Sequence, residues 1–325
     1  MERRLFDEQM AALDALKGRP LDVPARVLIK KMLGNRSNLL VAKAARLAEE
    51  NALADLMPDL LAAYDRFFTN PEKSDPQCWA KNALSRALAA LECRDKDVFL
   101  RGLRHHQMEP TWGGRSDSAA GLRANCAHAL VACEGLDNQE LLVLLLDPLL
   151  DKDKSVRVEA ARAIGQVGAL AVAVLRLRAL IPGEEPEVLA ACFAALLAIE
   201  RDAAIPFVAG FLDAEDGSAG EAAFALAETH SPVALAALLK RQSRPKEAWL
   251  VSVLLSAIAL TRLPAAIDSL IAMIAGDAYE APMAVEAIGR SAPSEQTRAR
   301  VWQAVEQSGS PRLKNAFHEH FTAQE

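Results

Sequence analysis

The segment from Arg104 to Gly121, RHHQMEPTWGGRSDSAAG, gathers the residue types that most often bind or react. Imidazole rings can hold a metal or carry a proton, an indole ring is a favoured anchor of protein interfaces, and guanidinium groups pair with carboxylates and phosphates. Because insertions on a rigid framework concentrate binding residues, we expect a binding site here. The candidate residues of this segment and of the helix expected just before it are Trp112, Arg101, Arg104, His105, His106 and Arg115.

The histidines of the chain do not have the spacing of a metal site. His105 and His106 are adjacent, so on a helix they point in different directions, and no third ligand follows at a useful spacing. His318 and His320 are two residues apart and also face different sides of a helix. We therefore expect neither a metal nor a cofactor.

Motifs of catalysis are also missing from the sequence. The chain has no GxSxG and no HExxH, and no histidine stands near a plausible nucleophile and acid. The WGG stretch at 112–114 is not a phosphate-binding loop, because no strand is expected before it. The sequence therefore predicts that the protein is not an enzyme.

Trp112 has two interpretations that the sequence leaves open. The indole could fold back and cover the helices at the point where the spacing of the chain changes. Alternatively, it could stay exposed and anchor a partner.

Composition narrows the class of protein. The 325 residues are 51% hydrophobic but only 5% aromatic, which is typical of packed helices rich in alanine and leucine. The net charge of −6 argues against broad affinity for nucleic acid, and the apolar runs are too short or too interrupted by charge to span a membrane. Five cysteines without a CxxC pair indicate buried free thiols in a reducing compartment. We expect a cytoplasmic protein.

A pair made of a small residue and then a large aliphatic residue recurs along the chain, with Arg46 replacing the small residue in the first copy. The large residues are Leu47, Leu88, Leu130, Ile164, Leu196, Leu226, Ile258 and Ile288. Their separations are 41, 42, 34, 32, 30, 32 and 30 residues, which is the range of helical-repeat proteins. Each interval holds an alanine-rich amphipathic helix followed by a leucine-rich one, so stacked pairs would bury a continuous core.

The clearest copy of the unit, residues 153–168, reads DKSVRVEAARAIGQVG. It has an aspartate before the helix, a Val-Arg step, an Ala-Ala pair and then Ala-Ile-Gly. This pattern resembles the first helix of a HEAT repeat of the short type that phycobilisome-lyase-like proteins also contain. The resemblance implies that the aspartate and the basic residue link successive repeats. The residues that it assigns to this ladder are Asp153, Arg157, Arg123 and Lys81.

These patterns predict an all-α protein, an α-solenoid of about eight stacked helix-pair repeats closed by helical caps. We expect an N-terminal cap at 1–36, a repeat array at 37–309 and a C-terminal partial repeat or cap at 310–325. Insertions are expected near 67–77 and 104–121.

The expected function is that of a non-catalytic scaffold, in which the groove of a curved, armadillo-like solenoid binds a protein or peptide. Two alternatives stay open. One is an enzyme accessory or lyase-like HEAT protein, and the other is a HEAT-like binder of nucleic acid. The lyase-like resemblance rests on the repeat pattern alone and assigns no site residues.

Overall fold

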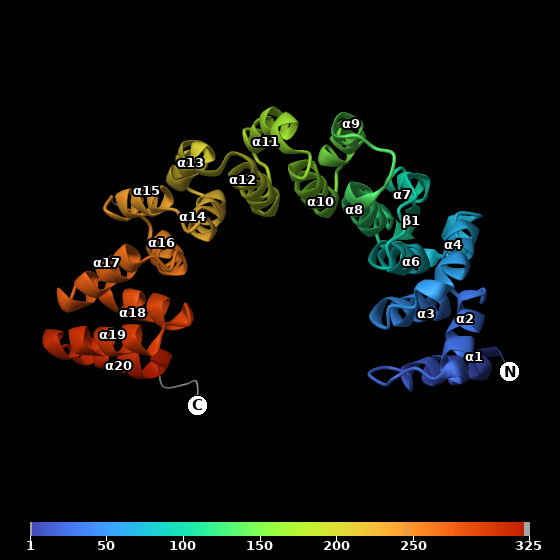
Figure 1. The fold of residues 1–325 in the computed structure, drawn as a ribbon, viewed down its shortest axis with the longest axis horizontal. Coiled ribbons are helices and arrows are strands. Elements are labelled where there is room, and N and C mark those ends of the chain that lie inside the picture. The colour runs from blue at the N-terminus through green and yellow to red at the C-terminus, as the bar shows by residue number, and fades with distance from the viewer. Residues whose placement is uncertain (1, 245, 322–325) are drawn as a thin grey trace. The chain divides into compact units, whose positions relative to one another are not determined.

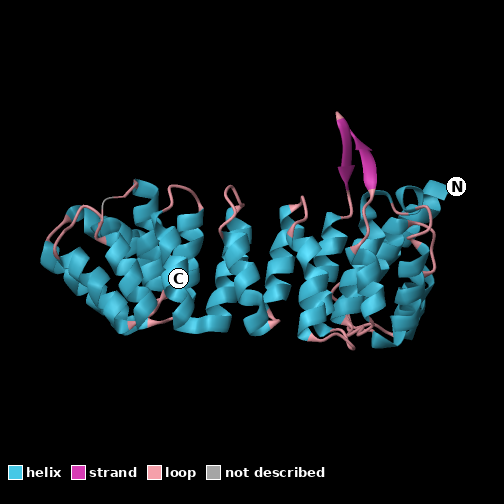
Figure 2. Ribbon diagram, turned by 90° about the horizontal axis from the view of Figure 1, so that it is seen from above, coloured by secondary structure: helices cyan, strands magenta, loops and turns pink. Residues whose placement is uncertain are grey.

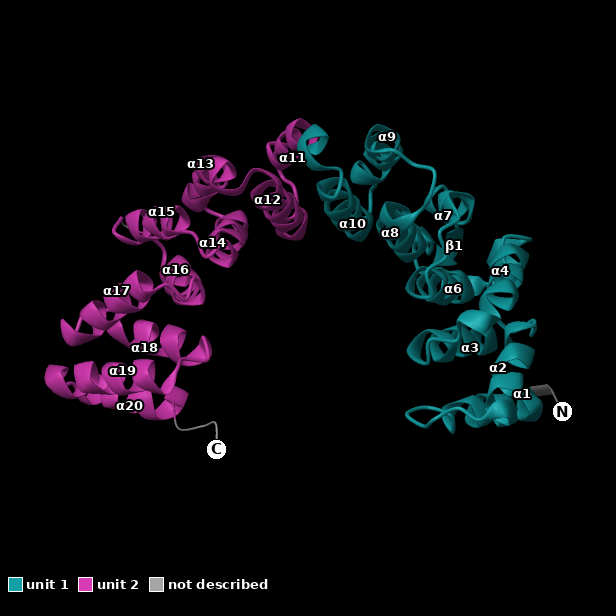
Figure 3. Ribbon diagram, in the orientation of Figure 1, with its two compact units in different colours: residues 1–171 teal, residues 172–325 magenta. Residues whose placement is uncertain are grey.

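The computed structural model describes residues 2–244 and 246–321 (Figure 1). By its internal contacts the chain divides into two compact units, Met1–Ala171 and Val172–Glu325 (Figure 3). Each unit is a stack of helix pairs. Within the described residues, no helix is both long and apolar enough to cross a membrane.

The first unit arranges its longer helices in two rows (Figure 1). The first helices of the pairs, which stack directly on one another, are α3 (Asn38–Glu50), α6 (Trp79–Ala90), α8 (Ala120–Ala129) and α10 (Lys154–Gly165). The other row holds α2 (Val23–Leu33), α4 (Met57–Arg66), α7 (Lys96–Leu103) and α9 (Asn138–Leu149). The remaining helical pieces are α1 (Glu2–Asp14), η1 (Ala54–Leu56), α5 (Pro71–Ser74), η2 (Pro76–Cys78), η3 (Leu130–Ala132) and η4 (Gly168–Ala171).

The second unit repeats the same plan. Its stacked first helices are α12 (Pro186–Glu200), α14 (Ser218–Glu228), α16 (Ala248–Leu260) and α18 (Ala281–Arg290), and α20 (Pro311–Phe321) packs on α18. The other helices are α11 (Val172–Ala179), η5 (Arg201–Ala204), α13 (Ile205–Ala209), η6 (Gly210–Asp213), α15 (Pro232–Gln242), α17 (Pro264–Ala275) and α19 (Glu295–Ser308).

Local sequence signals explain where many of these helices begin. A side chain that accepts a backbone N–H of the first turn caps several helices, as Asp137 does for α9, where Glu140 completes a capping box. Proline occupies the first turn of others, where its missing N–H costs little, as Pro186 does in α12 and Pro232 in α15.

The spacing of the aliphatic residues is confirmed as the spacing of the repeats. All eight of the large residues are buried, and they lie in or directly after α3, α6, α8, α10, α12, α14, α16 and α18. Alanines three and four positions earlier, such as Ala160 and Ala161 in α10, are fully buried, so neighbouring helix backbones approach closely. The protein is an all-α helical-repeat solenoid, as the sequence predicted.

A two-stranded hairpin is the exception to the helical plan (Figure 2). Strand β1 (Met108–Thr111) pairs antiparallel with β2 (Gly114–Asp117). The sequence predicts no strand, and that prediction is wrong. Proline, glutamate, glycine and aspartate are poor strand formers, so the hairpin depends on tertiary contacts that no local pattern reveals.

The cap and array boundaries stay a prediction. Helices α1 and α2 fall within the expected N-terminal cap at 1–36, and α20 falls within the expected C-terminal cap at 310–325. Residues 322–325 of that second cap lie outside the described residues. The first expected insertion, 67–77, contains α5 and most of η2.

Candidate binding site at the hairpin

The hairpin between α7 and α8 projects from one side of the first unit (Figure 2). Trp112 and Gly113 form the turn, and Gly113 has φ +94°, a conformation that favours glycine. The Trp112 side chain is fully exposed, at 106% of its reference area. This exposure excludes the interpretation that the indole folds back on the helices, because a large apolar ring stands in solvent at the hairpin tip.

A buried carboxylate holds the base of the hairpin. Glu109, on β1, is only 5% exposed. It accepts hydrogen bonds from the Gln77 N–H at 2.8 Å, the Gln77 side-chain amide at 2.6 Å and the Ser118 hydroxyl at 3.1 Å. The Gln107 side-chain amide donates both to Glu109 and, at 2.8 Å, to the Asp75 carbonyl. The two insertions expected from the sequence therefore meet at this network.

These contacts keep the Glu109 carboxylate charged. Burial would raise the pKa of Glu109, but hydrogen bonds from Gln107, from Gln77 and from Ser118 lower it below its ordinary value. An ionised carboxylate that accepts several hydrogen bonds holds β1 firmly in place, since hydrogen bonds to a charged group are stronger than those between neutral groups.

A second carboxylate joins the hairpin to α8. Asp117, at the end of β2, accepts from the Gln107 N–H and the Ala119 N–H, each at 3.0 Å. Arg123 Nη1 donates to Asp117 at 2.7 Å, and the His106 ring nitrogen lies 2.9 Å away. Burial would raise the pKa of Asp117. The backbone donors, His106 and the Arg123 charge together hold the pKa well below its usual range.

Arg123 carries the network into the next repeat. Its Nε donates to Asp151 at 2.7 Å, just before α10, and Arg157 donates to the Asp151 carbonyl at 2.7 Å. One repeat earlier, Lys81 Nζ lies 2.9 Å from Asp75, and both side chains are fully buried. Arg123 thus contacts carboxylates on both sides, from β2 and from the start of the next repeat.

Asp153 caps the helix that follows it, whereas the family resemblance implied that it links successive repeats. It is the N-cap of α10 and accepts from the Ser155 N–H at 2.8 Å. The carboxylate that receives Arg123 belongs to Asp151, two residues earlier. Both aspartates precede the same helix, so the sequence pattern does not distinguish the capping residue from the one that contacts the neighbouring repeat.

Two of the candidate residues pack around Phe68 instead of at the hairpin tip. The Arg101 guanidinium lies 4.1 Å from the centre of the Phe68 ring and pairs with Asp65 at 2.7 Å. His105 meets Phe68 edge-on, with ring centres 5.0 Å apart. The pKa of His105 is lowered, chiefly by burial. Both side chains are engaged within the fold.

Arg104 and Arg115 both have exposed side chains. Arg115 donates to the Met108 carbonyl and lies 3.3 Å from Glu72. Arg104 ends α7, and its side chain forms no hydrogen bond or ion pair with any other described residue. The structure therefore does not bring the six candidates into one cluster. It leaves Trp112 and Arg104 as the two whose side chains are uncommitted within the described part of the chain.

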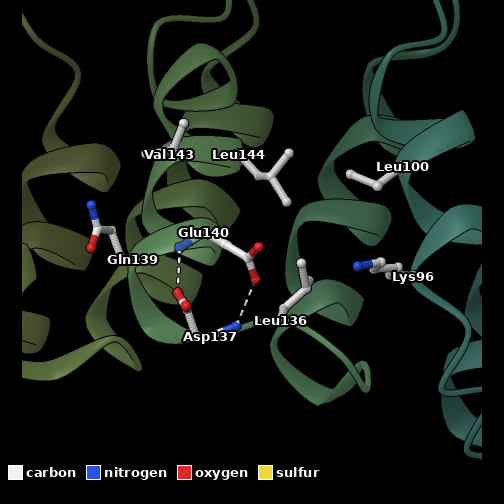
Figure 4. Close-up of a pocket in the computed structure, with 8 residues that line it drawn as sticks. All are labelled: Lys96, Leu100, Leu136, Asp137, Gln139, Glu140, Val143 and Leu144. Carbon is white, nitrogen blue, oxygen red and sulfur yellow. Dashed lines mark hydrogen bonds between the residues drawn. The ribbon is translucent and has the colours of Figure 1, made fainter.

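An open groove of about 430 Å³ lies between α7 and α9 (Figure 4). Its lining residues are Lys96, Leu100, Leu136, Asp137, Gln139, Glu140, Val143 and Leu144. Val143 is 61% exposed. The sequence did not indicate this groove, because the run LLVLLLDPLL is apolar on every side and does not show which residues face outward.

The thiols of the chain are not poised for chemistry. Burial raises the pKa of Cys78, Cys126 and Cys192 to about 12, so each is a protonated thiol near neutral pH. Among the described residues, no group of three or more His, Cys, Asp and Glu side chains is placed to hold a metal ion.

Comparison with known proteins shows a likeness to solved structures. No protein-family profile matches the chain, and no curated protein matches it. A solved structure, the complex of CpcE and CpcF of phycocyanin lyase from Nostoc sp. PCC7120, is similar with a TM-score of 0.39 and 19% identity. The likeness covers 78% of this chain and 94% of that chain. That structure is a complex of two different protein chains.

The expectation that the protein is not an enzyme is corrected by this comparison. The similar chain belongs to a lyase, so the lack of a recognisable catalytic motif in a helical-repeat sequence does not place it outside the enzymes. A likeness of this size assigns neither an activity nor a substrate to the present chain.

Proposed function

We propose that the chain is a helical-repeat interaction protein that binds a protein partner through the hairpin of residues 108–117, with Trp112 as the anchor. The observation that carries the proposal is the fully exposed Trp112 side chain at the tip of an ordered turn. Tryptophan is among the residues that contribute most to protein interfaces when a partner buries them.

The base of the hairpin supports this proposal. Glu109 and Asp117 fasten β1 and β2 to the rest of the first unit through charged hydrogen bonds. A partner therefore meets Trp112 on a turn that is already held in place, and binding costs little further conformational entropy. Arg104, on the helix that leads into the hairpin, adds an uncommitted cation for a carboxylate of the partner.

The test is affinity purification of the tagged full-length chain from its native cell, with Trp112→Ala beside the wild type. Removing the anchor should cost about 2 kcal/mol, which is roughly a thirtyfold loss of affinity, so the partner should disappear from the eluate. Adding Arg104→Ala should deepen the loss.

Trp249→Ala is the matched control. Trp249 lies on α16 of the second unit and is 41% exposed, so the same aromatic group is removed away from the hairpin. It should leave recovery unchanged. If Trp112→Ala recovers every protein that the wild type recovers, the hairpin is not the binding site.

A second candidate function is that of a subunit in an enzyme complex, as CpcE and CpcF are in their lyase. The same purification tests it. Recovery of an enzyme or of a pigment-binding protein, stoichiometric and dependent on Trp112, would favour this candidate. A partner of any other kind would count against it.

A further inference from the structure

The two edges of the hairpin can be told apart from its hydrogen-bond register. The Ser118 N–H donates to the Gln107 carbonyl at 2.9 Å, which makes 107 and 118 a bonded pair. Bonded pairs alternate in an antiparallel ladder, so the pairs 109–116 and 111–114 are also bonded. The backbone groups of residues 108 and 110 therefore point outward from β1, and those of 115 and 117 point outward from β2.

The outer edge of β1 is blocked at both positions. Pro110 has no N–H to offer. The Met108 carbonyl is already taken by the Arg115 guanidinium, which reaches across from β2. Proline and covering charged groups are two devices by which proteins prevent edge strands from pairing with other chains.

The outer edge of β2 has no such protection. Neither Arg115 nor Asp117 uses its backbone N–H or carbonyl in a hydrogen bond to another described residue. Gly114, Arg115 and Ser116 are all exposed on this strand. An unpaired strand edge of this kind is a template for one further strand.

The two outward-facing residues of β2 select a register for pairing with itself. In an antiparallel pair of two β2 strands, outward-facing residues must stand opposite each other to form hydrogen bonds. Opposing Arg115 to Arg115 sets Asp117 opposite residue 113 of the turn, and opposing Asp117 to Asp117 sets Arg115 opposite residue 119, beyond the strand. Opposing Arg115 to Asp117 of a second copy pairs both outward-facing residues of each strand and leaves Ser116 opposite Ser116 on the twofold axis.

We propose that the partner at the hairpin is a second copy of this chain, joined through the β2 edges into a four-stranded antiparallel sheet. This inference rests on the proposed function and names its partner. The Arg115 N–H of each copy donates to the Asp117 carbonyl of the other copy, and the Arg115 carbonyl accepts from the Asp117 N–H. The twofold interface is therefore self-complementary. Trp112 lies four residues before Ser116, and each indole therefore reaches the base of the other hairpin.

Cysteine crosslinking tests this register. Ser116→Cys places two thiols on the twofold axis, where the Cα atoms of a non-bonded antiparallel pair lie roughly 4.5 Å apart, within the reach of a disulfide. Gly114→Cys is the matched control, because its Cβ meets no atom within 4 Å and the two copies of residue 114 would lie about 13 Å apart. With oxidised glutathione as oxidant, Ser116→Cys should give a covalent dimer, and Gly114→Cys and the wild type should not.

Sedimentation of the purified full-length chain tests the hydrogen bonds. The wild type should be a dimer at micromolar concentrations. Arg115→Pro removes an outward N–H together with the side-chain hydrogen bond to the Met108 carbonyl, and it should raise the dimer Kd at least about tenfold relative to Arg115→Ala, which loses only the side chain. Met108→Pro applies the same substitution to the blocked β1 edge and should leave the Kd unchanged.

The outcomes separate the inference from the function on which it rests. A wild-type chain that stays monomeric overturns the inference, as does equal crosslinking of Ser116→Cys and Gly114→Cys. In either case, a different protein that is still lost from Trp112→Ala would leave the proposed function standing. If Trp112→Ala loses no partner in the affinity purification, the proposed function fails by itself.

Discussion

Gly102 stands where α7 approaches both α4 and α8. It lies in α7, and a Cβ at this position would run into the Tyr64 hydroxyl of α4 and the Cys126 sulfur of α8. Tyr64 and Cys126 already form a hydrogen bond of 3.7 Å, and both are buried. Because both side chains are buried, either could move only by displacing its neighbours.

Gly102→Ala should therefore destabilise the first unit by about 1–3 kcal/mol through overpacking. Urea unfolding followed by circular dichroism would measure the free energy of unfolding. Gly220→Ala is the control, since Gly220 is also helical, but its added Cβ would meet only Val253 at 3.7 Å, an ordinary contact. The control should be neutral or stabilising by up to about 1 kcal/mol, because alanine is the better helix former. Equal losses in both variants would refute the steric explanation.

The hairpin as an element depends on the charge of Asp117. This carboxylate joins β2 to the start of α8 and to Arg123, and its side chain is 21% exposed. Its folded pKa lies below the unfolded value of about 3.9. The stabilisation is therefore complete above that unfolded value, and it is lost as the pH falls below about 4 towards the folded pKa.

Asp117→Asn should cost about 3 kcal/mol at neutral pH, because it leaves the buried Arg123 with one charged partner fewer. Below pH 4, the free energy of unfolding should also decrease less in the variant than in the wild type. Urea unfolding of both proteins between pH 3 and pH 7 would measure these two effects. An unchanged slope against pH in the variant would mean that Asp117 is not the titrating group.

Helical repeats make each of the two units a chain of neighbour contacts. Within each unit, first helices pack on the neighbouring first helices, as α14 does on α12 and α16. Stability in such an array is approximately a sum of repeat and interface contributions. A core defect should therefore act on the adjacent repeats and fade along the chain.

Leu226→Ala offers a direct test, because Leu226 is fully buried in α14. The substitution should cost about 2–5 kcal/mol through lost contacts and a cavity. Hydrogen exchange should speed up in α12, α14 and α16 and stay unchanged in α3 and α6. Uniform acceleration over all of these helices would show one cooperative unit in place of a repeat array.

The sequence by itself determined the repeats. Positions such as Ala160 and Ile164 pack against neighbours that carry the same residue types, so the demands of packing recur at every interval and appear as a period in the sequence. A break in the period also predicts an insertion near 104–121, the range in which the hairpin lies, since the period can be followed without knowledge of contacts. The prediction that Trp112 belongs to a binding surface stays a prediction, although its exposure agrees with it.

Only the tertiary structure decided what that insertion does. The hairpin exists because Glu109 and Asp117 receive donors from Gln77 and Arg123, which lie 32 residues before the first and 6 after the second. Arg123 pairs with Asp151 and not with Asp153 because of the conformation of the loop before α10. Residue types and spacing carry no information about such distant pairings, because each depends on where the folded chain brings two segments together.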